Sequence, residues 1–330
     1  MGQVDGGGDE RDIPSPGPGE VVVEVHAAGI DAGLVHLLEG RPFPVKLALP
    51  LRGDRVLGID IAGTVHSVGE SVTAWAPGDA VFGAAQGLSG HGGLAEFARA
   101  RSEHLLAQPS TLDQEEAAVV PVSATAALHA VRDAAHVAAG HRVLVLGAGG
   151  GVGHFAVQIA KALGAHVTGA CSPGKAAMVE SLGADVVIDY TTQDPLEAGP
   201  YDAIIDTGGH RPLRHMRRAL TRTGAVVLVG SEPEGAPLGG LSRSLWAALV
   251  NPFTRHRLVM LNSSIGSQAL QDLAELIEAG MLRPVIHARY PLEHVSTAVQ
   301  QLGRGRGTGK TVITVAQPAE EAAWARFQRR

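Results

Sequence analysis

A seven-residue stretch, Gly147-Ala-Gly-Gly-Gly-Val-Gly153, has the residue types of a loop that binds phosphate. It follows the apolar run RVLVL, which predicts a buried strand, and precedes GHFAVQIAKAL, which predicts a helix. Residues without a Cβ let the backbone approach a phosphate, and the N–H groups and dipole of a helix N-terminus favour negative charge. We therefore predict that a dinucleotide's pyrophosphate is bound by Gly147, Gly150, Gly151, Val152 and Gly153.

The kind of dinucleotide depends on the loop after the next predicted strand, HVTGA, about 20 residues further on. An NAD-specific loop carries Asp or Glu there, whose carboxylate bonds the ribose 2′-hydroxyl. Here the loop reads CSPGK and contains no acid. Ser172 and Lys175 offer a hydroxyl and a cation, so we predict that they bind the 2′-phosphate and that NADP(H) is the preferred coenzyme. The alternative is a polar loop with a solvated lysine.

The elements around this loop follow two different patterns. Between residues 141 and 280, apolar strands alternate with amphipathic helices, which predicts a parallel, doubly wound sheet. Earlier in the chain, short β-rich segments punctuated by glycine predict a compact, barrel-like domain; they cover 20–28, 56–68 and 76–83. Residues 285–292 and 310–315 are expected to return as strands to that first domain.

The predicted fold is therefore α/β, with a Rossmann doubly wound parallel sheet inserted in a β-rich substrate domain. The residues 1–120 are expected to form the first part of the substrate domain, and 121–280 the dinucleotide-binding domain. The return to the substrate domain is placed at 281–315, and a tail at 316–330. A helical segment over 112–138, broken at Pro121, connects the first two parts.

The amino-acid composition of the chain excludes several classes of protein function. A chain of 330 residues can hold two domains, and 45% hydrophobic with 18% charged residues is typical of a folded protein. A net charge of −6 provides no basic surface for nucleic acid. The single cysteine, Cys171, excludes a disulfide framework and a multi-thiolate metal site. No apolar run approaches a membrane span and no signal peptide is evident, so we expect a cytoplasmic protein.

Several motifs occur in an order that resembles one enzyme family. They are GIDIAGTVHSVGESVTAWAPGDAVFG (58–83), GGLAEFA (92–98), VLVLGAGGGVGHFAVQIAKALGA (143–165) and GKTVITV (309–315). In these segments the chain resembles the quinone oxidoreductase branch of the medium-chain dehydrogenase/reductase superfamily. The resemblance implies a GroES-like substrate domain split around an inserted Rossmann domain, a small-molecule substrate and a homodimer.

The same resemblance implies roles for residues outside the glycine loop. Thr125 is expected near the nicotinamide, with Gly230 and Ser231 at the nicotinamide end of the coenzyme. Tyr190 is expected beside the adenosine, and Lys310 at the phosphates. Each has a structural alternative: for example, Tyr190 could be a packing group at a strand end, and Lys310 an exposed lysine on a strand.

Zinc is not expected. Zinc-containing relatives carry a ligand Cys and a ligand His at the positions that are Asp31 and Ile59 here, and the 15 histidines contain no HxxxH or HxH pair. Zinc stabilises the alkoxide of an unactivated alcohol during its oxidation. Without zinc, hydride transfer is easiest to an acceptor that delocalises the incoming charge. We therefore expect reduction of an activated C=C bond or a quinone.

The proton donor is less well defined by the sequence. Asp31 and His36 lie in the segment 29–50 that should line the substrate pocket, so both are candidate catalytic residues. Equally, Asp31 could cap the following helix and His36 could lie on its surface. Two other functions stay open: an NAD(P)H-dependent carbonyl or alcohol oxidoreductase, and a non-catalytic NADPH-binding protein.

Overall fold

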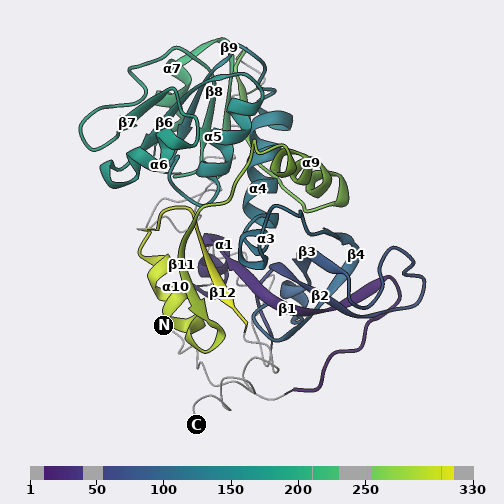
Figure 1. The fold of residues 1–330 in the computed structure, drawn as a ribbon. Coiled ribbons are helices and arrows are strands. Elements are labelled where there is room, and N and C mark those ends of the chain that lie inside the picture. The colour runs from purple at the N-terminus through teal and green to yellow at the C-terminus, as the bar shows by residue number, and fades with distance from the viewer. Residues whose placement is uncertain are drawn as a thin grey trace.

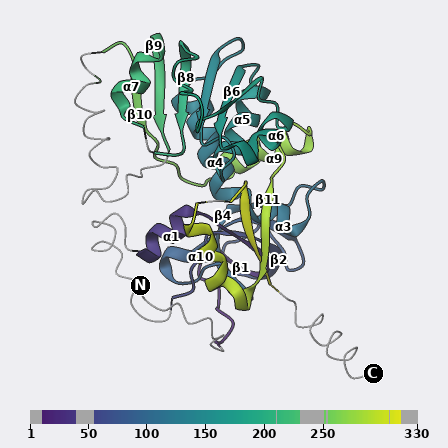
Figure 2. The same cartoon turned by 90° about the vertical axis from the view of Figure 1, so that its left-hand side faces the viewer.

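Two six-stranded sheets lie one above the other in Figure 1. The computed structural model describes residues 11–39, 55–209, 211–229, 251, 254–305 and 307–315. Helix α4 (Pro121–Leu128) lies between the two sheets in Figures 1 and 2. The sequence predicts this combination of a β-rich part and a parallel α/β part, and the structure confirms it.

The lower sheet contains the first strands of the chain and its last ones. Their order is β11-β12-β1-β2-β3-β4, and an additional pairing between β1 and β4 closes four of the strands into a barrel. Strand β12 pairs antiparallel with β1, so the C-terminal segment completes this sheet. The strands are β1 (Glu20–Ile30), β2 (Asp60–Val68), β3 (Ala80–Ala85), β4 (Phe97–Ala107), β11 (Ile286–Pro291) and β12 (Lys310–Thr314).

The upper sheet is parallel throughout and has the order β10-β9-β8-β5-β6-β7. The chain runs outward from β5 in one direction, then returns to β8 and runs outward in the other. In such sheets ligands bind beyond the carboxyl ends of the strands where the order reverses. The strands are β5 (Arg142–Leu146), β6 (His166–Cys171), β7 (Val186–Asp189), β8 (Tyr201–Asp206), β9 (Leu220–Leu228) and β10 (Arg257–Met260).

Helices cover both sheets. On the upper sheet they are α5 (Gly153–Ala162), α6 (Ala176–Ser181) and α7 (Leu213–Arg218), with the 3-10 turn η3 (Pro173–Lys175). Helix α9 (Ser267–Glu278) packs against α4 and β4. The lower part carries α1 (Ala32–Glu39), α3 (Gln114–Ala118), α10 (Val295–Gly303) and the 3-10 turns η1 (Gly87–Ser89) and η5 (Leu292–His294). The predicted break at Pro121 is confirmed, because this proline is the first residue of α4.

One buried cluster connects the two sheets. It contains Ala27 and Phe82 from the lower sheet, Val119 and Val120 between α3 and α4, and Phe155 from α5. All five side chains are fully buried. The two parts of the molecule therefore share a hydrophobic core at their junction, where α4 lies.

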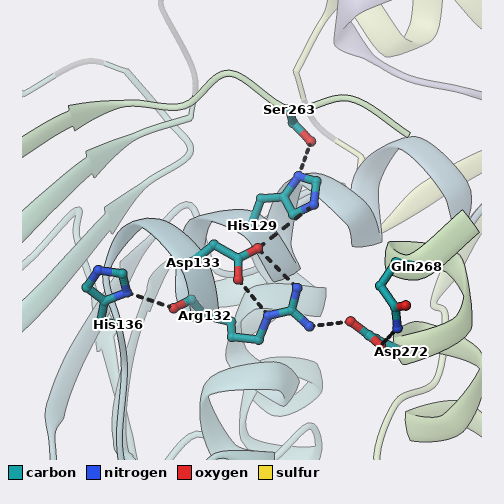
Figure 3. A network of polar contacts seen from close by, with 7 residues as sticks. All are labelled: His129, Arg132, Asp133, His136, Ser263, Gln268 and Asp272. Atoms are coloured by element: carbon teal, nitrogen blue, oxygen red, sulfur yellow. Dashed lines mark hydrogen bonds and ion pairs between the residues drawn. The ribbon is translucent and has the colours of Figure 1, made fainter. Parts of the chain in front are cut away.

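A short π-helix, η2 (His129–Ala134), continues α4 and was not predicted from the sequence. Figure 3 shows the polar contacts of this π-helix. His129 Nδ1 lies 3.0 Å from Ser263 Oγ, and Arg132 pairs with Asp272 of α9. Within the π-helix, Arg132 also pairs with Asp133. These contacts hold the end of α4 against α9 and the segment after β10.

Candidate coenzyme and substrate site

The glycine loop makes a turn that only glycine accommodates. The N–H groups of Gly147 and Ala148 donate to Ala170 O at the end of β6, over 3.1 and 3.0 Å. Gly147 has a φ of +77°, a left-handed conformation. A Cβ at Gly153 would lie 2.1 Å from Gly147 O. The loop therefore folds back tightly on itself at the start of α5.

This loop lies where the order of the upper sheet reverses. It leaves β5, and Thr207 just after the adjacent β8 donates its hydroxyl proton to Leu146 O over 2.8 Å. Gly150 N–H bonds Gly147 O, and Val152 is the residue that precedes α5. Because the first N–H groups of a helix have no carbonyl partner within it, this end of α5 can bind an anion.

Ser172 and Lys175 lie beside the glycine loop, as the sequence predicts for the loop after β6. Ser172 directly follows β6 and is half-buried. The Lys175 stem crosses Gly149, since a Cβ there would lie 2.6 Å from Lys175 Cδ. Its ammonium donates to Gly307 O over 2.5 Å. Burial lowers the pKa of Lys175, whereas the nearby Cys171 thiol raises it. A phosphate would therefore be a stronger partner for this partly desolvated cation than a neutral carbonyl is.

Tyr190 and Thr125 are two further residues that the sequence analysis expects at the coenzyme. Tyr190 follows β7, is half exposed, and donates its N–H to Cys171 O at the end of β6. Thr125 is fully buried on α4, and its hydroxyl oxygen has no hydrogen-bond partner among the described residues. A buried hydroxyl without a hydrogen-bond partner costs free energy, unless a bound ligand supplies that partner. Gly230 and Ser231 lie outside the described residues.

Lys310 is buried at the start of β12, near the glycine loop. It is 1% exposed, so the alternative of an exposed strand lysine is wrong. Its ammonium donates to Asp60 Oδ2 over 3.1 Å and to Ser123 Oγ over 2.9 Å. Its stem approaches the glycine loop, because a Cβ on Gly151 would lie 3.5 Å from Lys310 Cδ. A phosphate would have to compete with Asp60 for this cation.

A cavity of about 330 Å³ opens in the lower part of the molecule. It is lined from the segments 29–37, 57–59 and 87–88 and by Val122, and most of the lining side chains are aliphatic. Asp31 and His36 both line it, as expected for the substrate pocket. Asp31 also accepts the N–H of Leu34 at 3.2 Å, so it stabilises the first turn of α1 at the same time.

Sequence reasoning missed two buried anchors of the C-terminal return. His154 is fully buried; its Nδ1 bonds Gly150 O at 2.9 Å, and its Nε2 accepts the N–H of Val285 at 3.2 Å. One turn later, Gln158 bonds both the N–H and the carbonyl of Arg283. Helix α5 therefore holds the segment that leads to β11. The signal in the sequence was that two polar residues, His154 and Gln158, lie four positions apart in an otherwise apolar helical segment.

Burial lowers the pKa of the His154 imidazole from 6.5 to about 4. The unfolded chain therefore binds a proton at higher pH than the folded chain, so this stability is complete above pH 6.5 and is lost as the pH falls toward 4. We expect the free energy of unfolding to fall by about 2 kcal/mol more between pH 7 and pH 5 in the wild type than in His154→Gln. Urea unfolding at the two pH values measures the difference.

The comparison between the two proteins isolates His154. His91 and His256, whose pKa values are also lowered by burial, remain in both. Equal acid sensitivity of the wild type and the glutamine variant would contradict the assignment.

Metal-binding geometry does not occur in the described ranges. No group of three or more His, Cys, Asp or Glu side chains there could hold a metal ion. The absence of zinc stays a prediction from the residue types at Asp31 and Ile59.

Comparison with known proteins identifies the family. Residues 17–110 match the alcohol dehydrogenase GroES-like domain, and residues 182–313 match the zinc-binding dehydrogenase family. The name of the second match describes that family and not this chain's ligands. The chain is 31% identical to the mitochondrial NAD(P)H oxidoreductase RTN4IP1 of Homo sapiens, over 90% of this chain and 82% of the relative.

A chloroplast envelope quinone oxidoreductase homolog of Arabidopsis thaliana is 30% identical, over 91% of each chain. The solved quinone oxidoreductase of Coxiella burnetii has a similar structure, with a TM-score of 0.81, 28% identity and 93% of each chain covered. In the described part of this chain, no helix has the length and apolar character needed to cross a membrane. This chain therefore belongs to the NAD(P)H and quinone oxidoreductase branch of the medium-chain dehydrogenase/reductase superfamily.

Proposed function

We propose that this protein is an NADPH-dependent reductase that transfers hydride to an activated C=C bond or a quinone without zinc. The observation that carries the proposal is the glycine loop at the reversal point of the parallel sheet, with Lys175 lying across it. Relatives named NAD(P)H oxidoreductase and quinone oxidoreductase support the reaction class. Following the family resemblance, we further propose a homodimer.

The residues present fit a dinucleotide along the carboxyl edge of the upper sheet. In this proposal the glycine loop and the start of α5 hold the pyrophosphate, and Ser172 and Lys175 hold the 2′-phosphate. Tyr190 flanks the adenosine, and the unpaired hydroxyl of Thr125 bonds the nicotinamide end. When bound, NADPH supplies the hydride.

The cavity suits an apolar acceptor. Its aliphatic lining excludes water from the reacting atoms, and its size of about 330 Å³ suits a small molecule. The preference for conjugated acceptors depends on the residues that replace the zinc ligands of relatives. With Asp31 and Ile59 at those positions, the chain must rely on a substrate that delocalises the added charge.

Reduction of the acceptor requires a proton in addition to the hydride. We propose that this proton comes from the pocket, where Asp31 and His36 are the candidate groups. With an enone or quinone, NADPH oxidation should be at least about tenfold faster than with saturated ketones, aldehydes or alcohols at equal concentration. If Asp31 or His36 handles the proton, its alanine variant should lower kcat by about 100-fold. Loss of NADPH absorbance across the substrate panel measures both effects.

The panel also separates the alternatives. Preferential turnover of ketones or aldehydes would replace the proposal with a carbonyl reductase. Tight NADPH binding with no turnover on any class would indicate a non-catalytic NADPH-binding protein. Unchanged kcat in both alanine variants would show that water or another group supplies the proton.

A further inference from the structure

The lysine at the junction of the two sheets is buried together with a carboxylate. Lys310 and Asp60 are each 1% exposed, and their charged atoms are 3.1 Å apart. Asp60 is held on its other side by the N–H of Val122, which bonds its Oδ1 at 2.7 Å. Charges so deeply buried persist only when they are paired and hydrogen-bonded. The pair is therefore a fixed charged element between β2, β12 and α4.

A second carboxylate faces the same ammonium from the substrate pocket. Asp31 Oδ2 lies 4.0 Å from Lys310 Nζ, while Asp31 Oδ1 is held by the N–H of Leu34. One cation thus lies between two carboxylates, one buried and one lining the cavity. Burial raises the pKa of Asp60 to about 6, Lys310 opposes that rise, and Asp31 adds to it.

Lys310 also contacts the glycine loop, where the coenzyme is proposed to bind. Its stem lies against Gly151, and the preceding residue, Gly309, donates its N–H to Gly149 O over 3.0 Å. The same strand end therefore touches both the glycine loop and the aspartate of the pocket. Other titratable lining of the pocket comes from His36 on α1.

We propose that Lys310 is a positioning residue, which orients Asp31 in the substrate pocket, with Asp60 fixing the lysine in place. This proposal rests on the proposed reductase function only for the role of the pocket. Asp31 oriented in this way takes part in the proton transfer, either by itself or through water or His36 in the same pocket. Lys310 then acts through Asp31, and not mainly as a ligand of the coenzyme phosphates.

Carboxyl NMR of protein labelled at aspartate Cγ tests this directly, with the Asp31 and Asp60 resonances assigned from Asp31→Asn and Asp60→Asn. In Asp60→Asn the lysine faces Asp31 alone, so the Asp31 titration midpoint should fall by about 1 pH unit. In Lys310→Met the two carboxylates face each other without a cation, so the midpoint should rise by about 1 pH unit. Lys310→Arg should restore the wild-type value.

If Lys310→Met does not fold, the double variant Lys310→Met/Asp60→Asn removes both charges of the buried pair. The titration midpoint of Asp31 in this double variant should lie above its midpoint in Asp60→Asn, which keeps the lysine. Unmoved midpoints, with NADPH affinity alone reduced, would overturn the proposal and make Lys310 a phosphate ligand. The titration requires no turnover, so it distinguishes failure of this inference from failure of the proposed reaction. In an active enzyme, the acid limb of the kcat/KM profile should move in the same direction as the midpoint.

Discussion

We expect the replacement of Gly153 with alanine to lower the affinity for NADPH by at least about 100-fold, equivalent to about 2.7 kcal/mol. The added Cβ would lie 2.1 Å from Gly147 O and 2.9 Å from Ala148 Cα, both backbone atoms that cannot rotate away. The turn must open, which moves the start of α5 away from the position where it would hold the pyrophosphate. Calorimetric titration with NADPH measures the loss.

Gly174→Ala is the matched control. Gly174 lies in the neighbouring turn beside Lys175, and a Cβ there would meet no atom within 4 Å. Its NADPH affinity should stay within about twofold of the wild type. Urea unfolding of Gly153→Ala separates lost binding from lost folding, since a local clash costs about 1–3 kcal/mol. A folded Gly153→Ala protein with normal affinity would show that the loop does not hold the coenzyme.

The second large effect concerns coenzyme choice. Lys175→Ala should weaken NADPH binding by about 10- to 150-fold, because a charge-assisted hydrogen bond contributes about 1.5–3 kcal/mol. NADH, which lacks the 2′-phosphate, should lose no more than about twofold. The NADPH/NADH ratio of kcat/KM should therefore collapse toward one.

Lys161→Ala provides the corresponding control. Lys161 is a comparable cation on α5, but it pairs with Asp185 at 2.5 Å on an exposed surface. Its loss should leave the coenzyme ratio unchanged. If Lys175→Ala keeps the wild-type ratio, the bond from Lys175 to Gly307 O is structural and the specificity lies elsewhere.

Local patterns in the sequence predict most of the fold. The alternating segment that begins at Glu20 predicts β1, the runs around the glycine loop predict β5 and α5, and Gly164 has the positive φ expected just after a helix. These features depend on residues close together in the chain. The two-residue repeat of a strand and the 3.6-residue repeat of a helix are visible directly in the order of apolar and polar residues.

The charged junction could not be predicted in the same way. The partners of Lys310 lie 250 and 187 residues away along the chain, at Asp60 and Ser123, so no local pattern relates them. Lys175 likewise reaches Gly307, 132 residues further on. The π-helix after α4 depends on a small shift in backbone hydrogen bonding that no residue spacing indicates.

We propose that the loop from Gly147 to Gly153 binds a nicotinamide dinucleotide. Calorimetric titration of the folded wild-type protein with NADPH and with NADH tests it most directly. We predict saturable, one-to-one binding of NADPH, with NADH binding more weakly. Heat-silent titrations with both coenzymes, together with no thermal stabilisation by either, would contradict the account.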